Sequence, residues 1–496
     1  MAEAEGEALP EQRPARHSPD AGTAAWPAPL PAPNRASAQE EISERAETVR
    51  TRGPGVAPAI PRASRQRLRG GFGRVAIVDG CRTPFARAGT TLSSLDAIDL
   101  AGIAAAELVA RTAVDPESID LSIFGTVVPA LYAPNLGREV VFRAALPATI
   151  PGSTVNLACA SSSRALINGA QAILSGEAQV VLAGGAESLS SVPLLYSRNA
   201  AQRLTELNRA ESMGARLATL GKLRLRDLAP VTPTIAEYLT GQTMGESCEQ
   251  MARENDISRF AQDEIALLSH RRAAAAVEEG RLDAQLVPVW LPDGQPVVVE
   301  DNGIRPTTSM EALAALPPAF DLRFGTLTAG NSSPLMDGAA VLLLMSEEGA
   351  RALGYRPLGY LRSYAFTALH PAGQLFQAAA YAAPLALERA GLGLADIDLL
   401  EMHEAFGAQI VSNLKALASQ RFAREELGRS SPVGEVDLER CNVNGGTLAF
   451  GHPFGATGAR VALQLLCELR RRGEQLGLAT VCAAGGVGFA MVVERE

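Results

Sequence analysis

Cys159 stands where an extended segment gives way to a helix, in the stretch VNLACASSSRALINGAQAILSG. A helix N-terminus and a nearby imidazole can lower the pKa of a thiol from its ordinary value of about 8.5, and the thiolate is the nucleophilic form. The setting therefore favours a reactive cysteine, although many free cysteines are only small buried hydrophobes. The serines at 161–163 suit the first helical turn, where hydroxyl oxygens can accept from unpaired amides.

Two glycine-rich segments near the C-terminus hold the other residues that suit this chemistry. CNVNGGTLAFGHPFGATGAR has five glycines around His452, and ATVCAAGGVGFAMVVE places Cys482 at the end of a predicted strand, before three glycines. Glycine lets the backbone approach a ligand closely and expose its amides. A thiol that can exchange protons and a histidine that can act as a base are both typical of covalent catalysis.

The chain contains a weak internal repeat. Leu108–Gly125 aligns with Ala386–His403 without a gap, so that Arg111 falls on Arg389 and Asp120 on Asp398, and VVLAGGA later matches VCAAGGV. The same order of elements on both sides favours duplication over chance. Because equivalent loops of a duplicated fold meet at its pseudo-twofold axis, we expect Cys159, His452 and Cys482 to converge.

Strand-like and helix-like segments alternate from GRVAIVDG onward, which predicts an α/β fold with a sheet covered on both faces. We expect a first half at 71–191 and 324–347, an inserted loop domain at 192–323, and a second half at 348–496. The insertion either contacts ligand or is an elaborated surface loop. Residues 1–70 are rich in Pro, Ala, Glu and Arg and poor in large aliphatics, so we predict a disordered tail.

Composition excludes several classes of function. The formal net charge is −9 with a pI near 5.4, which disfavours binding to nucleic acid or to an anionic membrane surface. The spacing of the six cysteines fits neither a disulfide scaffold nor a zinc site, so we expect no metal and a reducing compartment. No apolar run approaches the ~18–20 residues of a membrane-spanning helix, and we expect a soluble, cytoplasmic protein.

The motifs NLACASS, LTAGNSSPLMDGAA, HEAF, GGTLAFGHPFGATGAR and CAAGGVG occur in this order, and from Gly73 to Glu496 the chain resembles the thiolase family. HEAF, where many thiolases have Asn in place of His, resembles the thiolase subunit of fatty-acid oxidation complexes. The resemblance implies a duplicated five-layer α-β-α-β-α fold with two mixed-sheet halves. It also implies a 3-ketoacyl-CoA thiolase, an acyltransferase that needs no cofactor because coenzyme A is a substrate.

The resemblance also assigns roles to residues. Cys159 is the nucleophile that keeps the acyl chain as a thioester; His452 takes its proton and then helps to stabilise the oxyanion with His403. Cys482 protonates the departing acetyl-CoA enolate and then deprotonates the incoming coenzyme A. The family pattern further implies a second oxyanion pocket made by the backbone N–H groups of Cys159 and Ala484, and a contact of Ser333 with the pantetheine arm. Alanine at 484 fits only if its φ is negative.

Three alternatives to the degradative thiolase stay open: a biosynthetic thiolase that makes acetoacetyl-CoA, a decarboxylating ketoacyl synthase and a non-catalytic lipid carrier. Cys482 argues against the synthase, and the presence of all three key residues argues against the carrier. We expect a homodimer or homotetramer, and HEAF raises the possibility of a hydratase–dehydrogenase partner subunit. The remaining histidines are expected to be structural, with His270 on a surface helix and His370 in a loop.

Overall fold

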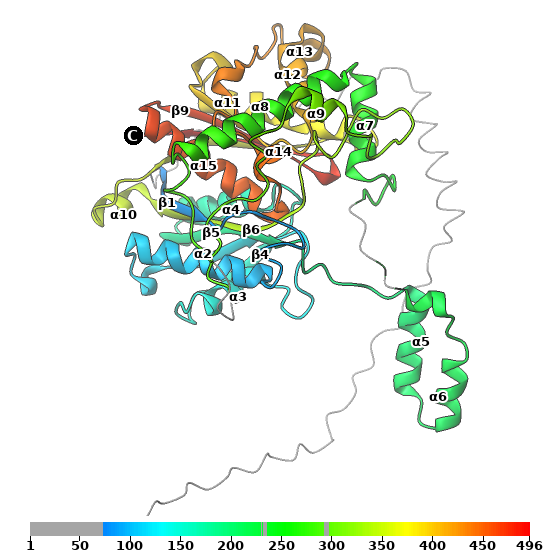
Figure 1. Cartoon of the computed structure of the whole chain (residues 1–496). Coiled ribbons are helices and arrows are strands. Elements are labelled where there is room, and N and C mark those ends of the chain that lie inside the picture. Colours follow the sequence, from blue (N-terminus) through cyan, green and yellow to red (C-terminus); the bar gives the residue numbers. More distant parts are fainter. Residues whose placement is uncertain (1–72, 230, 232–235, 292–296) are drawn as a thin grey trace, which may run out of the picture. The chain divides into compact units, whose positions relative to one another are not determined.

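A computed structural model describes residues 73–229, 231, 236–291 and 297–496 (Figure 1). The predicted disordered tail at 1–70 lies outside the described residues. Ten strands of this part of the chain form one mixed sheet in the order β4-β3-β5-β6-β1-β7-β10-β9-β8, with β2 paired to β6. The strands are β1 (Val75–Arg82), β2 (Ala86–Arg87), β3 (Leu121–Gly125), β4 (Gly152–Val155), β5 (Val180–Ser188), β6 (Met336–Ser346), β7 (Gly359–Ala368), β8 (Leu399–Met402), β9 (Leu476–Ala483) and β10 (Val487–Glu494).

The sheet is parallel only in part. Strands β4, β3 and β5 run parallel in the first half and β8 and β9 in the second, whereas all other pairs are antiparallel. An antiparallel pairing of β1 with β7 joins the halves. Strands β5 and β6 are buried along nearly their whole length, which agrees with helices on both faces of the sheet. The predicted α/β class and mixed-sheet halves are confirmed.

The duplication recurs in the hydrogen bonds of the two halves. Asp120 accepts the backbone N–H groups of the residue before β5 and of its first residue, at 2.7 and 3.0 Å. Asp398, its predicted equivalent, accepts the same two N–H groups at the start of β9, at 3.0 and 2.8 Å. Arg111 likewise donates to a carbonyl of β1, and Arg389 to a carbonyl of β7. The weak sequence repeat therefore marks a real structural repeat.

Helices form three layers around the two halves of the sheet (Figure 1). Helices α4 (Ser161–Ser175) and α15 (Thr457–Arg472) share the central core with both halves. Helices α2 (Ala97–Thr112) and α3 (Leu136–Arg143) cover the outer face of the first half, and α8 (Arg259–Glu278), α11 (Ala378–Ala390) and α12 (Gly407–Ala418) cover that of the second. The five-layer expectation is met. A Cβ on Gly458 would lie 2.1 Å from the Ser163 hydroxyl oxygen, so glycine permits the close crossing of α15 and α4.

The other helices begin and end as follows: α2 (Ala97–Thr112), α3 (Leu136–Arg143), α5 (Arg198–Arg209), α6 (Met213–Leu220), α7 (Met244–Glu254), α8 (Arg259–Glu278), α9 (Met310–Ala314), α10 (Glu347–Ala352), α11 (Ala378–Ala390), α12 (Gly407–Ala418), α13 (Gln420–Glu425) and α14 (Thr447–Phe450). Asp96 begins α2 with a capping box, and α4 and α15 end at glycines in the left-handed conformation. No helix among the described residues is both long and apolar enough to cross a membrane.

Among its described residues, the region predicted as an insertion contains helices α5 to α9. Part of α8 joins the core of the second half, and part of α7 joins a small core with Cys482. The prediction of a surface position for His270 is wrong: its side chain is 4% exposed because α8 packs against this core, and its Nδ1 accepts the N–H of Arg305.

Candidate active site

Cys159 lies in a tight turn between β4 and α4. Ala158, the residue before it, has φ 47°, a left-handed conformation that is costly for a residue with a Cβ and is often found at functional sites. The Ser161 hydroxyl fixes the turn, because it accepts the N–H of Leu157 at 2.8 Å and donates to the carbonyl of Ala158 at 2.6 Å. The turn therefore presents a half-buried thiol just before the first residue of α4.

The serines at 161–163 occupy the first turn of α4, as predicted, and two of their hydroxyls accept backbone N–H groups, but not those of their own helix. Helix α4 has Ala160 at its N-cap and no side-chain cap. Ser161 bonds to the turn before the helix, and the Ser162 hydroxyl accepts the N–H of Ala459 in α15 at 2.9 Å. The Ser161 hydroxyl thus stabilises the Cys159 turn. The Ser162 hydroxyl joins α4 to α15, because the close crossing of the two helices brings the Ala459 N–H within reach.

His403 directly follows β8, and its backbone N–H donates to the carbonyl of Thr480 in β9 at 2.9 Å. Its ring Nδ1 lies 2.9 Å from the hydroxyl oxygen of Thr447. The side chain is 1% exposed. The position of this ring is therefore fixed by the strand at one end and by a hydroxyl at the other.

His452 lies between α14 and α15. Its backbone N–H donates to the carbonyl of Pro334 at 2.9 Å, and its ring Nδ1 lies 2.6 Å from the hydroxyl oxygen of Thr457, the first residue of α15. In both histidines a threonine hydroxyl binds Nδ1, which leaves Nε2 free for chemistry. Neither threonine was identified from the sequence, where each is one polar residue within a glycine-rich run.

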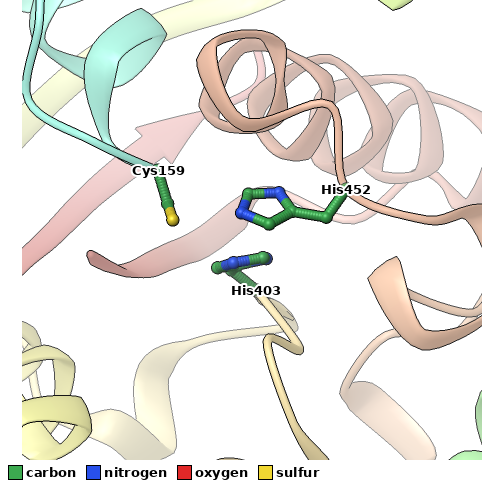
Figure 2. Close-up of side chains that lie close together, drawn as sticks. All are labelled: Cys159, His403 and His452. Carbon is green, nitrogen blue, oxygen red and sulfur yellow. The ribbon is translucent and has the colours of Figure 1, made fainter. Parts of the chain in front are cut away.

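The Cys159 thiol and the two imidazoles converge, as Figure 2 shows. One donor atom from each of Cys159, His403 and His452 lies within 4.8 Å of the other two, and the histidine ring centroids are 4.2 Å apart. Both Nε2 atoms are buried and have no hydrogen-bond partner. Unpaired buried nitrogens are costly, so their presence next to a thiol points to a substrate oxygen or a transferred proton as the missing partner.

The electrostatics of the resting site differ from the sequence prediction. Burial raises the pKa of the Cys159 thiol to about 12, although the N–H groups of Ala484 and of Cys159 itself lower it. Burial lowers the pKa of His452 from 6.5 to about 3, with a further contribution from Arg460, and that of His403 falls well below 6.5. The resting site thus holds a neutral thiol and two neutral imidazoles. The expectation of a lowered thiol pKa is wrong, because desolvation outweighs the helix N-terminus here.

Cys482 is the penultimate residue of β9 and Ala484 directly follows this strand, and both lie near the Cys159 thiol. Cys482 is 1% exposed; burial and then the neighbouring Cys159 raise the pKa of its thiol well above 9.0. The backbone N–H groups of Ala484 and of Cys159 itself both lower the pKa of the Cys159 thiol, which indicates that they lie near the sulfur. Ala484 is not among the described residues with positive φ, so the condition set for an alanine at this position is met.

Ser333 lies between the two histidine loops. Its backbone N–H donates to the carbonyl of Ala405, two residues after His403, at 3.0 Å, and the following Pro334 accepts from His452. The side chain is half-buried. The segment that carries Ser333 therefore touches both histidine loops, which agrees with a position beside a bound substrate.

Two buried carboxylates support these loops. Glu404 accepts from the Ser269 hydroxyl, the Asn442 amide and the backbone N–H of Leu448. Glu237, which the sequence analysis did not identify, accepts the N–H of Gly485 at 2.6 Å. Part of the central region thus supports the turn that holds Ala484, and is more than a surface loop.

Comparisons with known proteins agree with this geometry. The model of the thiolase N-terminal domain matches residues 75–348, and that of the thiolase C-terminal domain matches residues 355–495. The 3-ketoacyl-CoA thiolase of Yersinia enterocolitica is 49% identical over 423 residues, covering 85% of this chain and 97% of the relative, and that of Serratia proteamaculans is 47% identical with the same coverage.

Solved structures show the same fold. The acetyl-CoA acetyltransferase of Bacillus anthracis aligns with a TM-score of 0.74 and 32% identity, over 85% of this chain and 99% of that one. Human mitochondrial 3-ketoacyl-CoA thiolase aligns with a TM-score of 0.72 and 30% identity, over 86% of this chain and 99% of that one.

Proposed function

This chain belongs to the thiolase family, and from that premise we propose that it cleaves 3-ketoacyl-CoA with coenzyme A to give acetyl-CoA and an acyl-CoA two carbons shorter. It is an acyltransferase. One observation carries the proposal: the half-buried Cys159 thiol lies against two neutral imidazoles whose Nε2 atoms have no partner. This arrangement supplies a nucleophile, a base and oxyanion donors in one place.

The first half-reaction begins when His452 Nε2 takes the Cys159 proton and the sulfur attacks the 3-keto carbon. The negative charge that forms on the keto oxygen lies close to the sulfur, and the nearby N–H groups of Cys159 and Ala484 are its proposed donors. Such preorganised backbone donors contribute about 2.7–4 kcal/mol each to the transition state. The thiol and the imidazole are neutral at rest and become charged only during the attack. The negative charge then develops on the keto oxygen, next to backbone N–H donors that are already in position.

Collapse of this intermediate breaks the C2–C3 bond and leaves an acyl group on Cys159. The electron pair moves to C2 and onto the thioester oxygen of the departing acetyl-CoA enolate, which His403 Nε2–H and the protonated His452 stabilise. The Cys482 thiol then protonates C2. In the second half-reaction the Cys482 thiolate takes the proton of coenzyme A, whose sulfur attacks the acyl-enzyme. This releases the Cys159 thiolate, which regains its proton from the protonated His452. Two cysteines divide nucleophilic and acid–base work in this scheme.

Biosynthetic formation of acetoacetyl-CoA is the second candidate. The chemistry is reversible and uses the same residues, and one structural neighbour is an acetyl-CoA acetyltransferase. The higher identity to proteins named 3-ketoacyl-CoA thiolase favours the degradative direction, in fatty-acid β-oxidation. A series of kcat/KM values for coenzyme A-dependent cleavage of short, medium and long 3-ketoacyl-CoA substrates separates the two, because activity restricted to acetoacetyl-CoA contradicts the proposal.

We further propose a cytoplasmic homodimer or homotetramer that needs no cofactor or metal, with Ser333 against the pantetheine arm and the region at 192–323 holding the nucleotide end of coenzyme A. The HEAF segment supports assembly with a hydratase–dehydrogenase subunit. Cell fractionation and native mass spectrometry of the protein purified from its source test these points. Recovery of this chain only as a homo-oligomer contradicts the assembly proposal.

A further inference from the structure

The Thr447 hydroxyl lies between a backbone amide and a catalytic ring. Its oxygen accepts the N–H of Glu404 at 2.8 Å and lies 2.9 Å from His403 Nδ1. Thr447 begins the short helix α14 and is 0% exposed, so water does not compete for either contact. The hydroxyl is therefore a fixed part of the loop that carries His403.

The Thr447 hydroxyl has a single acceptor for its proton. A backbone N–H can only donate, so the Glu404 amide occupies a lone pair of the Thr447 oxygen. Among the described residues, the only further atom within hydrogen-bond distance of this oxygen is His403 Nδ1. If Nδ1 carried a proton, the hydroxyl would accept twice and its own buried proton would have no acceptor, an arrangement that folded proteins avoid. The Thr447 hydroxyl therefore donates to Nδ1, and the ring proton of neutral His403 is on Nε2.

We propose that Thr447 is a positioning residue that holds His403 as the Nε2–H tautomer, so that His403 acts as an oxyanion donor and not as the base for Cys159. The inference rests on the proposed function, in which His403 is already the donor, and adds the residue that fixes its tautomer. His403 Nε2 is buried without a protein partner and faces the thiol, so its proton is available to the enolate oxygen of the departing acetyl-CoA.

The contacts of His452 differ from those of His403. The Thr457 hydroxyl has His452 Nδ1 as its only hydrogen-bond partner among the described residues, at 2.6 Å. No backbone N–H holds this oxygen as the Glu404 amide holds that of Thr447, so the contacts assign a tautomer to His403 alone. The base role of His452 rests on the proposed mechanism.

The tautomer can be measured in the wild-type enzyme, without any substitution at Thr447. The chain has only five histidines, so solid-state ¹⁵N NMR of enzyme with ¹⁵N-labelled imidazole rings is assignable by difference against His403→Gln. We expect His403 to show a protonated Nε2 and an unprotonated Nδ1. A protonated Nδ1 on His403 overturns the proposal even if the enzyme is an active thiolase, which separates its failure from that of the proposed function.

Substitutions test the consequence for turnover. Thr447→Val should lower kcat by about 10–100-fold with KM within about threefold, somewhat less than the ~10²–10³-fold typical of a lost oxyanion donor, because part of the ring population keeps the right tautomer. Thr447→Ser keeps the hydroxyl and should stay within about threefold of wild type. In a His403→Ala background, Thr447→Val should cost almost nothing further, since the ring through which it acts is gone.

Thr83→Val is the matched control for structural damage. The Thr83 hydroxyl is also 0% exposed and accepts a backbone N–H, that of Ala339 at 3.0 Å, but has no histidine partner. This variant should lose stability to a similar degree as Thr447→Val while keeping kcat. Loss of kcat to the same degree in Thr83→Val, or failure of Thr447→Ser to rescue, overturns the proposal.

Discussion

His403 and His452 come from loops of the same half of the molecule and lie with their ring centroids 4.2 Å apart, each with a threonine hydroxyl on Nδ1 and no partner on Nε2. Two imidazoles this close cannot both be charged at low cost, and burial keeps both neutral. The pair therefore places two Nε2 atoms beside one thiol, and each can have a different function.

Substitution of Cys159 and substitution of Cys482 should block different steps of the reaction. Cys159→Ala should abolish the acyl-enzyme, because no other residue in the site carries the nucleophile. Cys482→Ala should still form some acyl-enzyme but release it slowly, because the proton donor to the enolate and the base for coenzyme A are missing. Intact-protein and peptide mass spectrometry after mixing with a 3-ketoacyl-CoA distinguishes them. Acyl mass on Cys482 in place of Cys159 would reverse the two roles.

The buried imidazoles make stability depend on pH. The pKa of His452 falls from 6.5 to about 3 on folding, and that of His403 also falls well below 6.5. Below about pH 6.5 the unfolded chain binds protons that the folded chain does not, so stability should decrease as pH falls. Burial raises the pKa of the Cys159 thiol from 9.0 to about 12, so stability should also decrease as pH rises above about 9, where the unfolded thiol ionises.

Chemical denaturation from pH 4 to 10 tests this prediction. His452→Gln removes one of the titrating groups and should flatten the acid side, whereas His370→Gln changes an exposed loop residue and should not. A stability that stays constant between pH 7 and 5 in the wild type would contradict the buried neutral state of both rings.

Glu237 should affect catalysis through the Ala484 turn. Its carboxylate accepts the N–H of Gly485 at 2.6 Å. Gly485 directly follows Ala484, the proposed oxyanion donor. Glu237→Ala frees this turn, and a small displacement of a preorganised donor is costly; we expect kcat to fall about 10-fold or more. Glu246→Ala is the control, since Glu246 only completes the capping box of α7 at the surface and should change stability by ~1 kcal/mol without changing kcat.

Much of the site could be predicted from local sequence. Cys159 stands before a predicted helix and His452 and Cys482 stand in glycine-rich segments, and the internal repeat indicated that these sites would meet. The pKa directions could not be predicted, because desolvation of Cys159 depends on residues more than two hundred positions away. The same holds for Thr447 and Thr457, whose roles depend on which ring the fold places beside each hydroxyl, and for His270, which is buried by packing that its own helix does not encode.

Gly458 should be indispensable for the crossing of the central helices. A Cβ at this position would lie 2.1 Å from the Ser163 hydroxyl oxygen and 2.7 Å from the Ser163 backbone nitrogen. Because the backbone cannot yield as a side chain can, Gly458→Ala should destabilise the protein by about 1–3 kcal/mol in urea denaturation. It should also lower kcat, since α4 follows Cys159 and α15 follows His452. Gly214→Ala, in α6 with open space around the Cβ position, should be neutral or slightly stabilising.

The convergence of one thiol and two imidazoles should make the enzyme sensitive to Zn²⁺. One donor atom from each of Cys159, His403 and His452 lies within 4.8 Å of the other two, and Zn–S and Zn–N bonds of about 2.3 and 2.0–2.1 Å need only small side-chain movements from there. Both rings are neutral, the form that binds metal. Coordination through His403 Nε2 requires the ring proton to move to Nδ1, against the contact with the Thr447 hydroxyl, so His403 should be the weakest of the three ligands.

Zn²⁺ at micromolar concentration should therefore inhibit turnover, compete with 3-ketoacyl-CoA and release the Cys159 proton, with recovery after addition of a chelator. Equilibrium dialysis should find one tightly bound ion per chain in the wild type and weaker binding in His403→Ala, which keeps the thiol and His452 but loses the third ligand. Cys482→Ala should bind as the wild type does, because Cys482 stands outside the three-residue cluster. Undiminished binding in His403→Ala would place the metal elsewhere and contradict the prediction.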